Sequence, residues 1–404
     1  MHIGDSPEES TFRAECRAWL EAHAAPRTAK PSGGMGGSAE ELAEHTRQCK
    51  RWQGVLYEHG WAGIAWPTAF GGRGGTPMQA AIFAEEQNRF DIATGAFSVA
   101  AGMVAPTLMV HGTPEQKVHL DAILRGDEVW CQLFSEPGAG SDLASLGTRA
   151  ERDGDEWVVN GQKVWTSLGQ HSDFGILLAR TDPDAPKHRG ITYFIVDMTT
   201  PGIEVRPLKQ MTGISHFNEV FLTDVRIPAA NVVGEVNEGW RVAHTTLGNE
   251  RALIGGSSGQ WNFDEMIAEA RARGLTDDAR IRRGLVDVYI RANLLKYFGY
   301  RMRTALSRGE QPGPEASVMK LFVSRHGARS AEVAMQIIGA DGTLDGDDAP
   351  NGGLWQSVLL GQYMIRIGGG TDEVQSNVIG ERALGLPREP SNDREVPWRS
   401  AAKA

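Results

Sequence analysis

The middle of the chain, about residues 129–235, consists of short runs rich in β-branched and aromatic residues, separated by turn residues. Runs of this length and composition are typical of β-strands. Asp153-Gly154 and Asn160-Gly161 are two of the strongest sequence signals for a hairpin turn. The pattern therefore predicts a meander of antiparallel strands. The expected strands are Val129–Phe134, Glu156–Val159, Lys163–Ser167, Gly175–Arg180, Ile191–Val196 and Glu219–Val225.

Helical patterns flank this block on both sides. Residues 10–23 and 39–59 alternate charged and apolar side chains at helical spacing, and apolar residues from Leu285 to Met302 recur with a helical period. A helix–sheet–helix order with antiparallel strands predicts an α+β fold. The expected parts are an N-terminal helical domain at 1–128, a middle β domain at 129–235, a C-terminal helical domain at 236–385 and a loose tail at 386–404.

Composition excludes several classes of protein. The 404 residues include 41 Lys and Arg against 51 Asp and Glu, a formal net charge of −10, which disfavours nucleic acid or an anionic membrane as a partner. The three cysteines form no disulfide or zinc pattern, and no signal peptide is visible. We therefore expect a cytoplasmic protein without a metal site. The uncharged stretch Ile92–Pro114 is too interrupted by Gly and Pro to span a membrane, and we expect buried helix and loop there.

The segment Ser135–Asp142, with the sequence Ser-Glu-Pro-Gly-Ala-Gly-Ser-Asp, directly follows an expected strand. Its glycines allow backbone N–H groups to approach a ligand closely, and its hydroxyls can hydrogen-bond to that ligand. The segment lacks the glycine spacing of a Rossmann site, and no βαβ unit follows it. Alone, it is equally compatible with an ordinary glycine-rich turn.

Two further motifs accompany this segment. Asn160–Ser167 reads Asn-Gly-Gln-Lys-Val-Trp-Thr-Ser, and Gly368–Gln375 reads Gly-Gly-Gly-Thr-Asp-Glu-Val-Gln. In this order and in these zones, the three motifs resemble those of the acyl-CoA dehydrogenase family, over nearly the whole chain. The resemblance implies FAD-dependent α,β-dehydrogenation of an acyl-CoA thioester. It also implies a helical domain, a β-barrel-like middle domain and a C-terminal four-helix bundle, with FAD between them.

The resemblance assigns cofactor contacts residue by residue. The positions that match the family's flavin contacts are Gln132, Phe134, Ser135, Trp165, Thr166, Ser167, Thr371 and Glu373. Ser141 matches a position that touches substrate or a cofactor phosphate. Without the resemblance, Trp165 is more typical of a core residue and Ser167 of a strand end.

The family's reaction needs a carboxylate base, because the α-proton of a thioester is only weakly acidic. Many members carry this glutamate just before the Gly-Thr of the C-terminal motif, where this chain has Gly369. Members of the isovaleryl and long-chain type carry it on a bundle helix before an arginine, and Glu250-Arg251 matches that position. Taken alone, a Glu-Arg pair on a helix is more typical of a solvated face. The glycine at position 369, where many members carry the base, reverses this preference. The resemblance therefore implies Glu250 as the base, with Arg251, Gly369 and Gly370 beside the substrate.

Two segments depart from the family pattern. Family homodimers carry an Arg-x-x-Phe-Gly segment that reaches the neighbour's FAD, but residues 270–278 lack the Phe-Gly, and the glycine-rich segment at 336–342 is also changed. Similar losses occur in actinobacterial members that act on steroid side chains as two-gene α2β2 assemblies, although they also fit plain sequence drift. A homo-oligomer, with arginines from 271–283 at the FAD phosphates, and an α2β2 assembly with a paralogous subunit both stay open.

The resemblance also implies an electron acceptor such as electron-transfer flavoprotein and a branched or bulky, steroid-type acyl chain. Small residues at 255–259 follow Glu250 and predict either space for that acyl chain or close helix packing. Two other functions stay open: a flavin-poor partner subunit of a heteromeric acyl-CoA dehydrogenase, and a flavin monooxygenase of the same fold. The intact motif at 135–142 and Glu250 argue against both.

Overall fold

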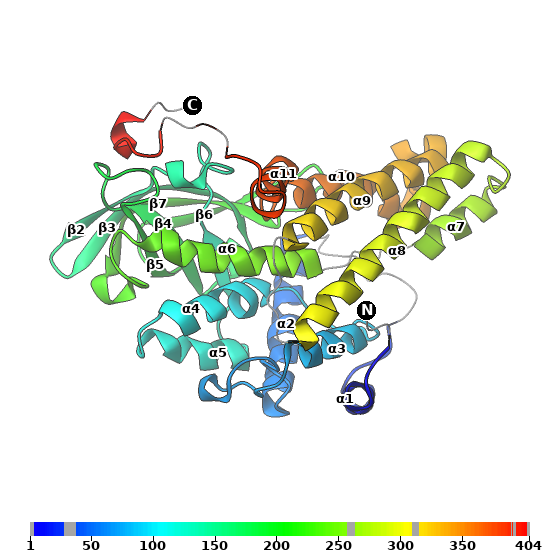
Figure 1. Ribbon diagram of the computed structural model, residues 1–404, viewed down its shortest axis with the longest axis horizontal. Helices are drawn as coiled ribbons and strands as arrows, with labels where there is room; N and C mark the ends of the chain where they lie inside the picture. Colours follow the sequence, from blue (N-terminus) through cyan, green and yellow to red (C-terminus); the bar gives the residue numbers. More distant parts are fainter. Residues whose placement is uncertain are drawn as a thin grey trace. The chain divides into compact units, whose positions relative to one another are not determined.

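The structure of the protein, a computed structural model, describes residues 4–27, 38–256, 263–308, 315–388, 390 and 393–401 (Figure 1). The chain folds as two compact units. The first comprises Asp5–Glu250 together with the described residues beyond Arg388, and the second comprises Arg251–Arg388 together with Gly4. The first unit contains a β-sheet, and the second is helical.

The first unit begins with five helices: α1 (Pro7–His23), α2 (Ala39–Glu58), α3 (Pro77–Gln87), α4 (Ala105–His111) and α5 (His119–Arg125). α1, α2 and α3 each begin with a capping box, in which a Ser or Thr and the residue three positions later bond to each other's backbone N–H. The uncharged stretch Ile92–Pro114 forms a π-helical turn followed by α4, as expected. No helix among the described residues is long and apolar enough to cross a membrane.

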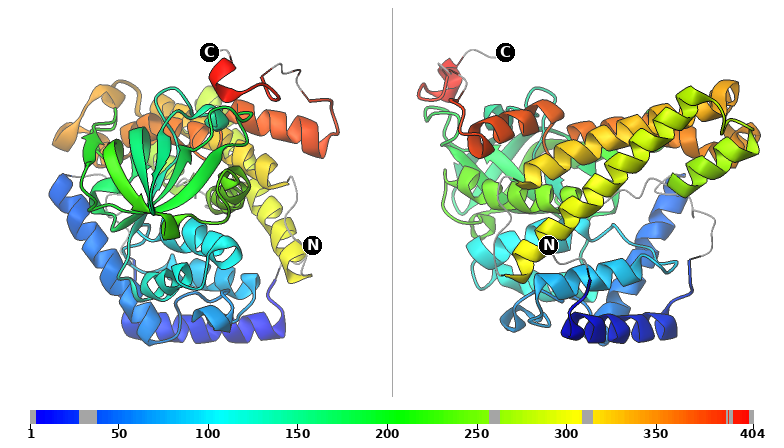
Figure 2. Two further views of the ribbon diagram at one scale, coloured as in Figure 1. Left: turned by 90° about the vertical axis from the view of Figure 1, so that its left-hand side faces the viewer. Right: turned by 45° about the vertical axis from the view of Figure 1, so that its right-hand side comes forward.

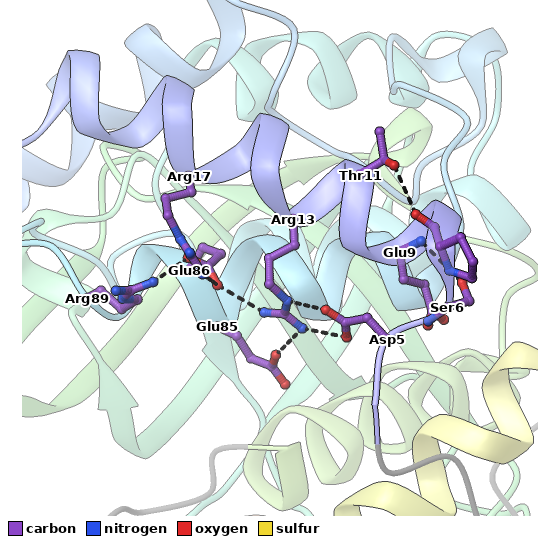
Figure 3. Close-up of polar contacts among 10 residues, drawn as sticks. Asp5, Ser6, Glu9, Thr11, Arg13, Arg17, Glu85, Glu86 and Arg89 are labelled. Atoms are coloured by element: carbon purple, nitrogen blue, oxygen red, sulfur yellow. Dashed lines mark hydrogen bonds and ion pairs between the residues drawn. The ribbon is translucent and has the colours of Figure 1, made fainter.

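A cluster of charged side chains joins α1 to α3 (Figure 3). Glu86 of α3 is only 3% exposed. Its carboxylate accepts hydrogen bonds from Arg13, Arg17 and Arg89. Arg13 also pairs with Asp5, at 2.5 Å. Because several guanidinium groups surround one buried carboxylate, the loss of solvation on burial is offset by hydrogen bonds and opposite charge.

Seven strands follow: β1 (Trp130–Leu133), β2 (Arg149–Asp153), β3 (Glu156–Ser167), β4 (Phe174–Arg180), β5 (Ile191–Asp197), β6 (Ile203–Leu208) and β7 (Phe217–Pro228). They form one curled sheet in the order β1-β4-β2-β3-β7-β6, with β5 paired to β4 (Figures 1 and 2). The pairs β2–β3, β3–β7, β6–β7 and β4–β5 are antiparallel, whereas β1 and β2 run parallel to β4. Helix α6 (Gly239–Gly256) follows the sheet.

β4 and β5 are buried on both faces. Ile176 and Tyr193 share a core with apolar residues of α4, α5 and α6. Leu177 and Phe194, one position further along each strand, pack inside the curl of the sheet against Trp157. Successive side chains of a strand point to opposite faces, so helices must cover one face while the sheet closes over the other. In Figures 1 and 2, α4 and α5 lie along one side of the sheet.

The strand predictions require three corrections. Asn160-Gly161 is not a turn, because β3 continues through it, with the Asn160 amide bonded to Asp224 of β7 at 3.0 Å. Gly161 is needed there for close packing, since a Cβ would lie 2.3 Å from the hydroxyl of Thr148. β2 and β6 were missed: β2 is largely exposed and carries a single apolar residue, and β6 is largely exposed and contains a proline. The meander is also incomplete, because β1 pairs with β4 in parallel.

The C-terminal tail is a further correction. Residues 393–401 lie against loops of the first unit, where the Trp398 indole donates to the Ser145 carbonyl at 3.2 Å (Figures 1 and 2). Prolines and charges suggested a loose segment, but the one tryptophan of the tail gives it an apolar group that packs onto the fold.

The second unit contains α7 (Phe263–Ala272), α8 (Ala279–Ser307), α9 (Glu315–Ile338), α10 (Leu354–Ile367) and α11 (Asp372–Val378). α7 to α10 share one core, which includes Met266, Val288, Val333 and Trp355. α8 covers the whole periodic stretch that the sequence indicated. Val288 and Leu295 of that stretch are buried, whereas Tyr289 is 53% exposed.

Candidate active site

The motif loop Ser135–Asp142 follows β1 and is held by a buried ion pair. The fully buried Lys163 of β3 donates from Nζ to Glu136 Oε1 at 2.7 Å and to the Phe134 carbonyl at 3.1 Å. Two backbone N–H groups of the following loop also donate to Glu136. Burial opposes ionisation of Glu136, but Lys163 and these N–H groups hold the pKa of its carboxyl below the ordinary value. Lys163 therefore fixes the beginning of the motif loop on the sheet.

Four of the expected site residues lie on β1 and this loop. Gln132 and Ser135 are half-buried, Phe134 is buried and Ser141 is exposed. The Ser135 carbonyl accepts a hydrogen bond from the N–H of Val164, at 2.9 Å. This bond places the start of the motif loop beside the end of β3, where the next three expected residues lie.

Trp165 of β3 has an unusual backbone. Its φ of +62° lies in the left-handed region, which residues with large side chains rarely adopt. The register of the β3–β7 pairing shifts at this point. The Trp165 indole is 59% exposed and meets the Phe217 ring edge-on, at 6.0 Å between centroids. An exposed aromatic side chain on a strained backbone is suited to packing against a flat ligand ring.

Thr166 and Ser167, the next two residues, differ from each other. The Thr166 side chain is fully buried, and its hydroxyl has no hydrogen-bond partner among the described residues. Thr166 can therefore meet a ligand only through its backbone. Ser167 is half-buried at the end of β3, so its hydroxyl can reach a ligand.

Glu250 lies on the face of α6 that is turned towards β1. Its Oε2 accepts a hydrogen bond of 3.4 Å from the Gln132 amide. One turn earlier, the buried Thr246 hydroxyl lies 2.9 Å from that of Thr107 on α4 and 3.1 Å from that of Tyr193 on β5. Residues four apart share a helix face, so these contacts direct Glu250 inward. The interpretation of Glu250 as part of a solvated face is not supported.

The turn Gly368–Thr371 belongs to the second unit, between α10 and α11. Gly369 and Gly370 have φ values of +66° and +88°, and a Cβ at 370 would lie 2.6 Å from the Gln375 amide nitrogen. Gln375 donates to the Gly369 carbonyl at 2.8 Å, and the fully buried Lys320 donates to the Gly370 carbonyl at 2.6 Å. In a planar trans peptide the N–H points opposite to the C=O. The N–H groups that follow these carbonyls are therefore directed away from Lys320 and Gln375.

The remaining expected residues of the second unit surround this turn or begin the unit. Thr371 caps α11 by accepting a hydrogen bond from the N–H of Val374, at 3.2 Å. Glu373 is exposed in the first turn of α11, and Arg251 is half-buried. The neighbouring Asp372 is buried and accepts hydrogen bonds from Ser324 and Arg366, which gives it a structural role.

The structure brings one set of expected residues into the first unit: Gln132, Phe134, Ser135, Ser141, Trp165, Thr166, Ser167 and Glu250. The second unit holds Arg251, Gly369, Gly370, Thr371 and Glu373. Sequence reasoning missed the two buried lysines that support these sets, Lys163 and Lys320. Lys320 interrupts an apolar run, with Val-Met before it and Leu-Phe-Val after it, and a lysine in such a run indicates a buried partner. Lys163 follows Asn-Gly-Gln, so the sequence around it gives no such signal.

The two segments that depart from the family pattern pack on each other. Arg273, after α7, pairs with Glu269 at 2.7 Å and with Asp341 at 2.9 Å. It also donates to the Ile338 carbonyl at 3.1 Å. Arg273 therefore serves structure in this unit. The other arginines that the sequence offers for phosphate contacts are all exposed: Arg271, Arg280, Arg282 and Arg283.

The residues present in the first unit fit a flavin. A flat, largely apolar ring with polar edges needs an aromatic partner and a few hydrogen-bonding groups. Trp165 offers the exposed aromatic side chain, and Gln132, Ser135 and Ser167 offer half-buried polar groups. The small residues expected to leave room beside Glu250 are not tested, because residues 257–259 lie outside the described part of the chain.

The fold consists of helices, then a curled sheet, then further helices, and it carries the three motifs that resemble one enzyme family. Comparison with known families agrees with this three-part arrangement. Three family models match consecutive parts of the chain: "Acyl-CoA dehydrogenase, N-terminal domain" over residues 6–127, "middle domain" over 131–225 and "C-terminal domain" over 237–384. The chain belongs to the acyl-CoA dehydrogenase family. It is thus an oxidoreductase acting on acyl-CoA, in a family that is generally FAD-dependent.

Individual relatives support this assignment. The chain is 41% identical to Acyl-CoA dehydrogenase FadE34 of Mycobacterium tuberculosis, over 86% of this chain but only 47% of that protein. It thus spans about half the length of that relative. It is 38% identical to Acyl-CoA dehydrogenase IpdE1 of the same organism, over 94% of this chain and 98% of that one.

Solved structures are also similar. The Tcur3481-Tcur3483 steroid ACAD is 30% identical, with a TM-score of 0.81 over 96% of this chain and 100% of that one. A chain of the ChsE4-ChsE5 complex from Mycobacterium tuberculosis is 30% identical, with a TM-score of 0.75 over the same shares of the two chains. The three-part fold expected from the sequence is confirmed.

Proposed function

We propose that this protein removes the α-proton and a β-hydride from an acyl-CoA thioester, with Glu250 as the base. The observation that carries the proposal is the position of Glu250. Its carboxylate meets Gln132 of β1, next to the motif loop, while glycine stands at position 369. FAD, when bound, accepts the hydride. A positioned carboxylate raises the rate of proton abstraction by about 10²–10⁴-fold.

The chain's own side chains have separate tasks in this proposal. The Gln132 amide orients the Glu250 carboxylate that takes the proton. The groups proposed to hold FAD are Gln132, Phe134, Ser135, Trp165, Thr166, Ser167, Thr371 and Glu373, with Ser141 at a phosphate or the substrate. Arg251 and the turn at Gly369 and Gly370 are proposed to bind substrate, because N–H groups directed at a thioester carbonyl stabilise the negative charge that develops there.

The proposed substrate carries a bulky, steroid-type or branched acyl chain, and electron-transfer flavoprotein is the proposed acceptor. The similarity to the Tcur3481-Tcur3483 steroid ACAD supports this substrate class. The ChsE4-ChsE5 complex supports an assembly with a paralogous subunit as an alternative to a homo-oligomer. The cytoplasmic localisation stays a prediction of the sequence.

The test of the base is Glu250→Gln. This variant keeps the size and the Gln132 neighbour but removes basicity. We expect FAD content to be unchanged and anaerobic flavin reduction by acyl-CoA to be slowed at least about 100-fold. Stopped-flow absorbance at the flavin band measures the rate. The matched control is Glu235→Gln, which makes the same change at an exposed position before α6, and we expect wild-type reduction from it.

Near-normal reduction in Glu250→Gln would contradict the assignment, and the exposed Glu373 would become the next candidate. The same assay separates the other functions. A flavin-poor partner subunit shows no flavin reduction that depends on its own Glu250, whether it is purified alone or with a paralogous subunit, and a monooxygenase is not bleached by acyl-CoA under anaerobic conditions. A panel of straight, branched and steroid thioesters tests the acyl chain. A higher kcat/KM for a straight medium chain than for any bulky thioester would reject the proposed substrate class.

A further inference from the structure

The C-terminal segment 393–401, called the C-terminal strap below, is bonded along its backbone to a loop of the first unit. The N–H of Trp398 donates to the Ala185 carbonyl at 2.9 Å, and that of Arg399 donates to the Pro183 carbonyl at 3.1 Å. The Arg399 side chain pairs with Asp184 at 2.6 Å. These bonds hold the strap against the loop that connects β4 and β5.

One charged contact runs from the strap to the motif loop. Lys187 Nζ lies 2.5 Å from Asp393 of the strap and 2.9 Å from Asp142, the last residue of the motif loop. The Lys187 side chain is only 9% exposed. Asp142 is bonded in turn to the Ser145 hydroxyl, at 2.6 Å. Lys187 therefore joins the strap to the residue next to Ser141.

A second contact runs through a buried arginine. Arg180 is 3% exposed and donates to the carbonyls of Ala144, at 2.6 Å, and Lys187, at 3.0 Å. Its guanidinium lies 4.9 Å from the centroid of the Trp398 ring. The Trp398 indole also donates to the Ser145 carbonyl. Trp398 thus covers the Arg180 guanidinium, which is bonded both to the segment after the motif loop and to the β4–β5 loop.

The first part of the motif loop is stiffened internally, because Glu136 and Ala139 exchange backbone hydrogen bonds of 3.0 and 3.1 Å and Ala139 is buried. The glycines on either side of Ala139 have fewer contacts. A Cβ at Gly138 or Gly140 would meet no atom within 4 Å. Glycines in open space lose much conformational entropy when a loop is ordered. The loop is fixed at its beginning by Lys163 and at its end by Asp142, and the second of these attachments involves the strap. Ser141 lies between the glycines and that attachment.

We propose that the C-terminal strap is a positioning element for the motif loop, which it holds in the shape that binds a phosphate-bearing ligand at Ser141. The proposal rests on the proposed function for the nature of that ligand, either the pyrophosphate of FAD or a phosphate of CoA. Asp393 and Trp398 act through Lys187 and Arg180, and neither has to touch the ligand. Without them the loop samples more conformations, and the ligand must order it on binding.

The experiment compares Asp393→Asn, Trp398→Ala and Trp398→Phe with the wild-type chain. Each variant is assayed for the Kd of FAD by fluorescence, the KM of acyl-CoA and the rate of flavin reduction at saturation. We expect Asp393→Asn and Trp398→Ala to raise the Kd or the KM about tenfold, with saturated rates within about threefold of wild type. Trp398→Phe keeps a ring over Arg180 and should give a smaller change. The matched control is Glu204→Gln, which removes one charge from an exposed pair with Arg206 in the same unit.

A rise confined to the Kd of FAD would show that the motif loop binds the pyrophosphate of FAD. A rise confined to the KM of acyl-CoA would show that it binds a phosphate of CoA. Hydrogen exchange of residues 138–148 gives a readout that needs no catalysis, and both main variants should speed it. Unchanged Kd, KM and exchange would overturn the proposal. If the wild-type flavin is not reduced by any thioester, the proposed function fails. The FAD constant and the exchange data then still decide whether the strap orders the loop.

Discussion

At the scale of single residues, backbone strain is what distinguishes Trp165 from a core tryptophan. Holding a residue other than glycine in the left-handed region costs about 1 kcal/mol or more. An exposed indole recovers little of this cost by burial. Leu168, three positions later, has a similar φ of +54° but is only 7% exposed. Burial accounts for the strain at Leu168. At Trp165 the strain coincides with the register shift of the β3–β7 pairing, and we propose that a bound ligand covers the exposed indole.

The first prediction compares these two residues. Trp165→Gly relieves the strain and removes an exposed ring, so the free energy of unfolding of the apo-protein should stay within about 1 kcal/mol of wild type. The Kd of FAD should rise at least about fivefold. Leu168→Gly empties a buried site and should lower the unfolding free energy by about 2–4 kcal/mol. Urea unfolding and flavin fluorescence measure both quantities. Equal destabilisation by the two changes would show that Trp165 is a core residue.

At the scale of elements, the pairing of α1 with α3 depends on Glu86. Burial opposes the charge of this carboxyl, but hydrogen bonds from Arg17, Arg13 and Arg89 lower its pKa from 4.5 to about 2. A carboxyl whose pKa is lower in the folded state stabilises the fold above pH 4.5, and this stability is lost as the pH falls towards 2. The shift corresponds to about 3 kcal/mol.

The second prediction follows from the lowered pKa of Glu86. Glu86→Gln should lower the unfolding free energy at pH 7 by about 3 kcal/mol and should flatten its decrease between pH 4.5 and pH 2. Glu44 on α2 is a matched control, because its pKa is also lowered, by Arg51 and Arg47, but its side chain is 43% exposed. Glu44→Gln should barely change stability, since exposed ion pairs are screened. Equal effects of the two variants would contradict the role given to burial.

The third prediction concerns the turn between α10 and α11. Lys320→Met leaves the Gly370 carbonyl without its donor and removes a cation from Asp372, so the turn should loosen. We expect kcat/KM for acyl-CoA to fall at least about tenfold, with a loss of about 1–3 kcal/mol in stability. Lys296→Met on α8 makes the same change at an exposed site and should leave both values unaltered. Wild-type kcat/KM in Lys320→Met would show that the turn does not depend on this bond.

Helices could be predicted from the sequence more reliably than strands, for a physical reason. Periodic apolar positions are local, and α1, α2 and α8 were found from them. The Asn160-Gly161 prediction failed because the decisive contact, Gly161 against Thr148, is not local. Family motifs led to the proposed site residues, which stay a prediction, whereas Lys163, Lys320 and the strap depend on partners distant in sequence.

At the scale of the whole molecule, the proposed base stands where the two units join. Glu250 is the last residue of the first unit, and Arg251 is the first of the second, both within α6. The residues proposed for catalysis and for substrate binding come from both units. Contacts of the second unit with other chains are therefore expected to act on substrate binding.

We propose that such contacts form on the surface of α8. Five apolar side chains of α8 are each about half exposed: Val286, Tyr289, Ile290, Leu294 and Tyr297. Val286, Ile290, Leu294 and Tyr297 are three or four positions apart, so they share one face of the helix, and Tyr289 lies beside them. A continuous apolar stripe of this kind is typical of a protein–protein interface. Homologous or identical subunits would bury it, in accord with the proposed assembly.

The last prediction is that the active form is an oligomer whose FAD site is completed by another chain. Replacing Ile290 and Leu294 together by Asp should dissociate it, because two charges would be buried in the stripe. Val118→Asp, at an exposed position of the first unit, is the control and should leave the assembly intact. Light scattering measures mass, and absorbance measures FAD per chain.

The segment at 270–278 lacks the family's Phe-Gly, and its Arg273 is already paired within the unit. The chain purified alone should therefore be poor in FAD and should gain it when co-expressed with a paralogous subunit. Stoichiometric, tightly held FAD in a homodimer or homotetramer would instead show that the exposed arginines suffice and that no second gene product is required.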